Sequence, residues 1–234
     1  MQRSSVTHER RADGDACDRT RRRLLLRAGA ALVAAGAGTA FPETVAVDPA
    51  VKPIRTFYDV LLAVMKQAKE LGIHGRYERL SAPIRATFDL AAMTRIAVGP
   101  DWNSFSAADQ TALVDHFTRM TIATYASRFD GYSGERFEVE PESEVRTTGR
   151  MVHTKLVQSN GEPLALNYLL RDTGGSWKVV DVYLTGTISE LATRRSEFAS
   201  ILKSGGASAL IASLQQRTET LLRGAPADAA PGAH

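Results

Sequence analysis

Apolar residues recur every three or four positions in three stretches of the first half of the chain. Such spacing places them on one face of an amphipathic helix. Gly72 ends the first stretch, Pro83 opens the second, and Ser106 with Asp109 three residues later has the spacing of a capping box. Helices are therefore predicted over residues 52–71, 83–98 and 106–129.

The spacing changes after Gly131, where apolar and polar residues begin to alternate. A period of two is typical of a strand with one buried face, and it is clearest around Tyr168. The turn-forming pairs Asn160-Gly161 and Gly174-Gly175 separate neighbouring strands as in β-hairpins. Four strands are predicted over residues 137–142, 145–158, 164–171 and 176–184.

Helical spacing returns near the end, where two helices are predicted over residues 188–203 and 207–223 around Gly205-Gly206. Helices, then an antiparallel meander, then helices indicate an α+β fold with the helices packed on one face of the sheet. From periodicity alone, an ordinary filled core between these layers is the simpler interpretation, because protein interiors are close-packed.

The first 46 residues predict an export signal that is cleaved from the precursor. A basic run at residues 21–27 precedes an Ala- and Gly-rich apolar stretch, the order of a secretory signal. About 13 apolar residues are too few to cross a hydrocarbon core of about 30 Å. Arg22-Arg23 before three leucines and Arg27 resembles a twin-arginine signal, with an ordinary Sec signal as the alternative. Residues 47–223 then form a single domain, and residues 224–234 predict a disordered tail.

Removing the leader changes the charge of the chain. The leader holds eight of the 29 Lys and Arg residues and five of the 26 Asp and Glu residues, so the mature chain carries 21 of each. The pI of about 9.1 thus describes the precursor, and it gives no reason to expect nucleic acid as a partner. Cys17, the only cysteine, also lies in the leader, which excludes a disulfide or a thiolate metal site in the mature domain.

His153 and Asp181, on two predicted strands, are the candidate acid–base pair if the chain is a small enzyme. Neither lies in a recognisable catalytic motif, and Asp181 is expected to hold backbone groups of a turn or helix, so we assign no catalytic residue. No metal site is predicted either, and no glycine-rich loop has the spacing of a phosphate site. A ligand-free interaction module is the other alternative to a binding protein.

Six short segments of the chain have an order and spacing that together resemble those of a known protein family. They are Gly75-Arg76-Tyr77, Phe88-Asp89, residues 117–134, residues 177–182, Gly186-Thr187-Ile188-Ser189 and residues 194–198. Together they resemble the MlaC or toluene-tolerance family of periplasmic lipid-binding proteins, over about residues 51–222. Residues 88–137, with Met93-Thr94-Arg95 and Val98-Gly99-Pro100, are most similar to the HpnM branch, which is associated with hopanoids.

The resemblance implies an NTF2-like curved antiparallel sheet with helices over its concave face, enclosing an apolar pocket. It implies no catalysis and no cofactor. It also implies a soluble periplasmic carrier for a hopanoid or a phospholipid. Such a carrier would shuttle lipid between an inner-membrane lipid transporter and an outer-membrane acceptor, with transient membrane contact.

We expect the lipid to contact apolar side chains that face the space between helices and sheet. Arg76 or Tyr77 is a candidate for holding the head group, whereas Arg194 and Arg195 are predicted to lie on a solvated helix face. The predicted lipid-binding residues are Phe57, Leu61, Met65, Phe88, Met93, Phe117, Met120, Tyr125, Leu166, Tyr168 and Val182.

Overall fold

The computed structural model describes residues 48–224. The predicted leader (residues 1–46) and residues 225–234 of the predicted tail lie outside this part of the chain. The helices are α1 (Val51–Lys66), α2 (Ala68–Thr87), α3 (Leu90–Val98), the 3₁₀ helix η1 (Gly99–Ser104), α4 (Ala107–Arg128) and α5 (Glu190–Leu222). The strands are β1 (Arg136–Val139), β2 (Glu144–Arg146), β3 (Gly149–Val152), β4 (Thr154–Val157), β5 (Pro163–Asp172), β6 (Trp177–Leu184) and β7 (Ile188–Ser189).

The helix predicted over residues 52–71 is divided between α1 and α2. Gln67 separates the two helices, five residues before the glycine that was expected to end the first. Gly72 lies inside α2 with a φ of 59°, a conformation that favours glycine. The helical conformation therefore breaks at Gly72, as predicted, and α2 consists of two helical segments on either side of this kink.

The boundary predicted at Pro83 is also displaced, because Pro83 lies within α2. The break comes at Phe88, which is extended and forms a bridge with Val179 of β6. Asp89 then caps α3, its Oδ1 accepting a hydrogen bond from Ala92 N at 2.9 Å. Pairing with the sheet and an acidic cap thus set this boundary, and the proline does not.

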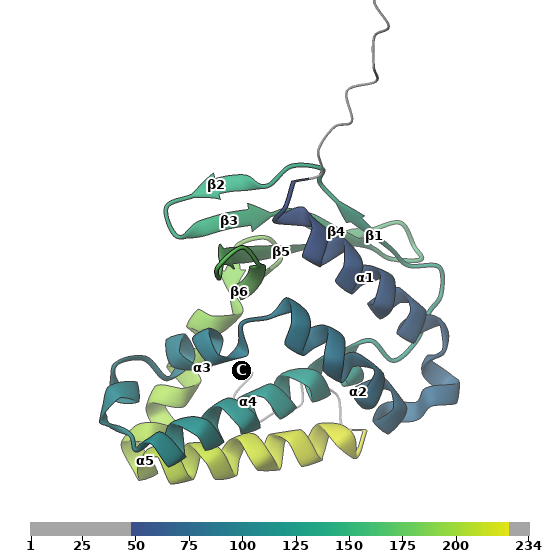
Figure 1. The fold of residues 1–234 in the computed structure, drawn as a ribbon. Helices are drawn as coiled ribbons and strands as arrows, with labels where there is room; N and C mark the ends of the chain where they lie inside the picture. The colour runs from purple at the N-terminus through teal and green to yellow at the C-terminus, as the bar shows by residue number, and fades with distance from the viewer. Residues whose placement is uncertain (1–47, 225–234) are drawn as a thin grey trace, which may run out of the picture. The chain divides into compact units, whose positions relative to one another are not determined.

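The start of α4 and the bend in α5 agree with the sequence patterns. Ser106 Oγ accepts a hydrogen bond from Asp109 N at 3.1 Å, which confirms the predicted cap. The two predicted C-terminal helices are the two segments of α5, which bends at Gly205 and Gly206. The second segment runs alongside α4 (Figure 1).

Strand β5 is the centre of an antiparallel sheet. One edge of β5 pairs with β4 through its first half and with β3 through its second half, and the other edge pairs with β6. β1 lies beyond β4, β2 lies beyond β3, and β7 pairs with β6. The strand predicted over residues 145–158 is therefore three strands, with a tight turn before Gly149 and a break at His153.

The helices cover one face of the sheet (Figure 1). Leu166, Tyr168 and Leu170 alternate along β5 and are buried in the same core as the helix side chains. β6 has a bulge at Val180, because Asp181 pairs with Leu169 and Val179 pairs with Leu170, which leaves Val180 without a paired residue on β5. Such a bulge bends the strand. These features confirm the predicted α+β fold. Within residues 48–224, no helix has the length and apolar character that crossing a membrane requires.

Candidate functional site

A cavity of about 390 Å³ lies between the helix-covered face of the sheet and helices α3, α4 and α5. Its sheet wall comes from β4, β5 and β6, and most of its opposite wall comes from α4. Apolar side chains make up most of the lining. The volume falls within the range of about 300–1,000 Å³ that is typical of small-molecule sites.

Eight of the eleven predicted lipid-binding residues line this cavity. They reach it from α3, α4, β5, β6 and the α2–α3 junction because the apolar faces of these elements point inward. The eight are Phe88, Met93, Phe117, Met120, Tyr125, Leu166, Tyr168 and Val182. Their contact with a lipid stays a prediction.

The other three predicted residues, Phe57, Leu61 and Met65, lie on α1 in the core and do not line the cavity. Phe57 supports the lining from behind, because its ring packs edge-on against those of Phe88 and Tyr125, each at 5.4 Å. Helical spacing showed that α1 has a buried face. It could not show that side chains of the neighbouring elements stand between this face and the cavity.

Tyrosine hydroxyls form a buried network beside the cavity. Tyr58 Oη donates to Tyr168 Oη at 3.2 Å and lies 2.6 Å from Thr154 Oγ1, which in turn donates to the carbonyl oxygen of Leu166. Burial raises the pKa of Tyr58 to about 12 and raises the pKa of Tyr168 well above its usual range. These buried hydroxyl groups are therefore uncharged and hydrogen-bonded, which keeps the free-energy cost of burying them low.

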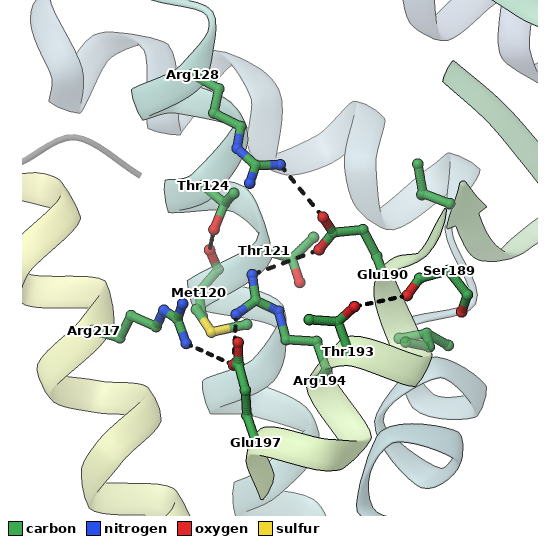
Figure 2. A network of polar contacts seen from close by, with 12 residues as sticks. Met120, Thr121, Thr124, Arg128, Ser189, Glu190, Thr193, Arg194, Glu197 and Arg217 are labelled. Carbon is green, nitrogen blue, oxygen red and sulfur yellow. Dashed lines mark hydrogen bonds and ion pairs between the residues drawn. The ribbon is translucent and has the colours of Figure 1, made fainter. Parts of the chain in front are cut away.

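A network of ion pairs borders the cavity on the side of α4 and α5 (Figure 2). Glu190 lies 3.8 Å from Arg128 and 3.7 Å from Arg194. Glu197 lies 3.1 Å from Arg194 and 3.0 Å from Arg217. Arg128, Glu190 and Arg194 line the cavity themselves. The bend in α5 brings Arg217, from its second segment, back to Glu197 in its first.

Arg217 lies at the inner end of this network, beside Glu197 and near Arg194. Burial lowers the pKa of Arg217, and the like charge of Arg194 lowers it further. Both effects arise because little water surrounds these groups, so each guanidinium depends on nearby anions. The cavity thus combines a largely apolar lining with a border of ion-paired side chains.

Sequence reasoning missed this charged border. Arg128 is the last residue of α4 and Glu190 the first residue of α5, and charges at helix ends commonly face water. Arg194 was expected on a solvated helix face, which is wrong, because only 9% of it is exposed. Arg195 beside it is exposed, as predicted. No local signal marks the difference, since it depends on how α4 and α5 meet.

Arg76, a candidate head-group ligand, lies elsewhere. Its Nε donates to the carbonyl oxygen of Ala126 at 2.8 Å and its Nη1 to that of Ala68 at 2.9 Å. These hydrogen bonds join α2 to α4 and leave Arg76 outside the cavity lining, as is Tyr77. Arg76 therefore stabilises helix packing.

Asp181 holds backbone groups, as expected. Its Oδ1 accepts hydrogen bonds from Val182 N at 2.8 Å and Leu191 N at 3.2 Å, and its Oδ2 accepts one from Ser189 Oγ at 2.6 Å. The carboxylate thereby joins the middle of β6 to the first turn of α5. That turn carries Glu190, so Asp181 fixes one end of the charged border.

His153 and Asp181 do not form the acid–base pair considered above. His153 Nε2 lies 3.0 Å from Glu144 Oε2, whereas Asp181 contacts β6, Ser189 and α5. Neither side chain lines the cavity. Among residues 48–224, no group of three His, Cys, Asp or Glu side chains is placed to hold a metal ion.

Comparison with known proteins agrees with this geometry. The MlaC protein family matches residues 55–216, which include every residue of the cavity lining. The solved structure of a phospholipid-binding protein from Ralstonia solanacearum, in complex with a phospholipid, is similar with a TM-score of 0.65. The two sequences are 25% identical, and the match covers 74% of this chain and 98% of that one. Among curated proteins there is no match. Because the family match spans most of the chain and the whole cavity, the chain belongs to the MlaC family.

Proposed function

We propose that this protein is a soluble periplasmic lipid carrier that holds a lipid in the cavity. It would shuttle the lipid between an inner-membrane transporter and an outer-membrane acceptor. The observation that carries the proposal is the cavity, whose lining is mostly apolar and comes from the elements that the family match covers. The phospholipid bound to the Ralstonia solanacearum protein of similar fold supports a lipid as the occupant.

The energetics of transfer suit such a carrier. Burying a methylene group is worth about 0.8 kcal/mol relative to water, so a chain of about 15 methylenes gains roughly 12 kcal/mol before other costs. Relative to a bilayer the gain is near zero, because both surroundings are apolar. The carrier can therefore retain lipid in water and exchange it at a membrane with no chemical step.

Two classes of lipid suit the apolar lining. A phospholipid is supported by the solved structure of similar fold, and a hopanoid by the resemblance of residues 88–137 to the HpnM branch. Acyl chains and polycyclic hydrocarbons are both held by non-directional apolar contact, so the apolar lining favours neither.

Solvent extraction tests the proposal directly. The full chain would be expressed with its leader, purified from the periplasm, extracted and examined by mass spectrometry. We expect a co-purified diacyl or polycyclic lipid in near-stoichiometric amount. A protein that is consistently free of lipid, and that takes up none from liposomes, would overturn the carrier proposal in favour of a ligand-free interaction module.

The substitution Leu166→Asp tests whether the cavity is the binding site. A carboxylate at this position would enter an apolar lining, so bound lipid should fall at least about tenfold. We expect the circular dichroism spectrum to remain that of a folded protein, because Leu166 borders the cavity as well as the core and the new carboxylate would have open space beside it. If Leu166 were ordinary core, unfolding would be the main effect instead.

Val145→Asp is the matched control for this experiment. Val145 is also an apolar strand residue, but it lies on β2, is 74% exposed and does not line the cavity. Its replacement should leave both lipid content and stability close to those of the wild type. Equal loss of lipid in both variants would mean that the cavity is not the site.

A further inference from the structure

Three of the described residues that line the cavity are exposed, and they mark its mouth. They are Arg128 at the end of α4, Leu164 at the start of β5 and Thr185 just after β6. The other described lining residues are buried or half-buried. A ligand that enters from outside therefore passes between the end of α4, the start of β5 and residues 185–187, which join β6 to β7 and are called the β6–β7 turn below.

Two of these three borders are held firmly. Arg76 Nε donates to the carbonyl oxygen of Ala126 at 2.8 Å, which ties the last turns of α4 to α2. Leu164 pairs with Leu156 of β4 inside the sheet. Moving either border would break helix packing or a strand pair.

The β6–β7 turn is held less firmly. Strand β7, which follows it, is only two residues long. β6 pairs with β5 from Leu166 onward, so the edge of β5 at Ala165 lies beside the turn and not beside β6. Asn167 Nδ2 donates to the carbonyl oxygen of Gly186 at 3.3 Å, a long hydrogen bond between the turn and β5. This border can therefore move with little loss of contact.

The backbone of the turn is strained. Thr185 has a φ of 50°, whereas the other described residues with a positive φ are glycines. This conformation is unfavourable for a β-branched residue. Gly186 has a φ of 84°, and Thr187 N donates to the carbonyl oxygen of Leu184 at 3.2 Å. These values are close to those of a type I′ turn, in which Asn-Gly is preferred.

The base of the β6–β7 hairpin is fixed. Asp181 accepts hydrogen bonds from Ser189 Oγ at 2.6 Å and from Leu191 N at 3.2 Å. These bonds hold the start of α5 against β6. A movement of the turn would therefore leave α5 in place.

We propose that the β6–β7 turn is the gate of the cavity: it closes the mouth against the start of β5 and swings away from Ala165 to let a lipid enter or leave. This inference rests on the proposed carrier function and adds the route of the cargo. Strain at Thr185 belongs to this role, because its relief in the open turn would offset part of the contact that opening loses.

A reversible cross-link tests the gate. A Cβ built on Gly186 lies 3.4 Å from Ala165 Cβ, close to the spacing of about 3.5–4.5 Å that disulfides have. Ala165 does not line the cavity, so a disulfide there would not fill it. The only natural cysteine, Cys17, lies in the predicted leader. The variant Ala165→Cys/Gly186→Cys can therefore lock the turn to β5 when oxidised and release it when reduced.

Transfer of pyrene-labelled phosphatidylglycerol from vesicles to the protein is followed by the loss of excimer fluorescence. We expect transfer to be at least about tenfold slower in the oxidised double variant than in the same protein after reduction. The backbone strain of the substitution at Gly186 affects both forms alike. Equal rates, with thiol titration showing that the disulfide is present, would overturn the gate. Failure of the disulfide to form under an added oxidant would contradict the closed position of the turn and overturn the gate as well.

Two substitutions of Thr185 should change the transfer rate in opposite directions. Thr185→Asn gives the Asn-Gly pair that the turn prefers, so the closed form gains stability and transfer should slow about threefold. Thr185→Val keeps the branched shape but loses the hydroxyl that donates to the carbonyl oxygen of Leu184 at 2.7 Å, so transfer should quicken about threefold. Thr187→Val, in the same turn but outside the cavity lining, should keep the wild-type rate. Rates that stay constant, or that shift in one direction in both Thr185 variants, would overturn the role of the strain.

Failure of the gate and failure of the carrier function give different results. A wild-type protein that takes up no pyrene-labelled lipid, and that yields no lipid on extraction, contradicts the carrier function itself. A wild-type protein that takes up the lipid at a rate which neither the disulfide nor the Thr185 substitutions change is a carrier whose cargo passes elsewhere, and it overturns the gate alone.

Discussion

Asp181 shows how a single buried residue positions part of the cavity wall. It contacts the backbone on both sides of the β6–α5 connection, and its third partner, Ser189, caps α5 by accepting a hydrogen bond from Ala192 N. This role could be predicted from the resemblance to the family, in whose pattern Asp181 follows Trp177 and is expected to hold backbone groups of a turn or helix. The position of Glu190 beside the cavity follows from it.

Replacing Asp181 by alanine should lower the free energy of unfolding by about 2–3 kcal/mol, because buried donors would lose a charged acceptor. Urea denaturation measures the change. Asp115→Ala is the control, since Asp115 is half-exposed and forms an ion pair with Arg119 one turn away on α4, a contact worth at most about 0.5 kcal/mol. Equal losses in the two variants would mean that the contacts of Asp181 contribute nothing.

Among the elements, the β2–β3 hairpin depends on one glycine. Gly149 has a φ of 149°, and a Cβ at this position would lie 2.2 Å from the carbonyl oxygen of Leu170 on β5. The close approach allows β3 to pair with β5 directly after a tight turn. A side chain here would therefore displace the hairpin or the central strand.

Gly149→Ala should destabilise the protein by about 2 kcal/mol or more, through backbone strain and the clash with Leu170. Thermal unfolding followed by circular dichroism would show the loss as a lower melting temperature. Gly131→Ala should change it little, because Gly131 lacks a positive φ and a Cβ there would meet no atom within 4 Å. An unchanged melting temperature for Gly149→Ala would contradict the close approach.

Elements could be predicted where their signals are local. The Ser106 cap, the bend at Gly205 and Gly206 and the apolar face of β5 each depend on residues close together in sequence. The boundary at Phe88 could not be predicted, because it depends on pairing with Val179 in a strand much later in the chain. The same distinction between local and long-range signals applies to the residues of the cavity. Its apolar lining follows from helix and strand faces, whereas its ion pairs form only where the ends of α4 and α5 meet.

At the scale of the whole described domain, Asp48 connects the segment before α1 to the sheet. Its Oδ2 accepts hydrogen bonds from Ser143 N at 2.9 Å and Ser143 Oγ at 2.6 Å, and it lies 3.3 Å from Arg150 Nη1. Its Oδ1 accepts a hydrogen bond from Ala50 N at 2.8 Å. One carboxylate therefore connects the beginning of α1 with the β2–β3 hairpin.

This connection predicts a dependence of stability on pH. Burial alone would raise the pKa of Asp48, but hydrogen bonds from Ser143 and Ala50 and the charge of Arg150 outweigh it and lower the pKa below 3.8. The stabilisation is therefore present above the unfolded-state pKa and is lost as the pH falls through the lower, folded-state value. Asp48→Asn should cost about 1–2 kcal/mol at pH 7.

The difference between wild type and Asp48→Asn isolates the contribution of this carboxylate from that of other groups. Urea denaturation of both proteins should show the difference shrinking as the pH falls from about 5 to about 3, because only the wild type loses a charge at this position. A difference that stays constant over this range would mean that the Asp48 contacts do not depend on ionisation.

The tyrosines beside the cavity have a consequence for the conditions under which such a protein can work. Tyr58 titrates only near pH 12, and the pKa of Tyr168 is also well above its usual range, because burial favours the neutral phenol. A carrier in the periplasm, as proposed, would be exposed to the acidity or alkalinity of the growth medium. Because burial raises the pKa of both phenols above the ordinary value for tyrosine, moderately alkaline surroundings would not place phenolate charge beside a bound hydrocarbon chain.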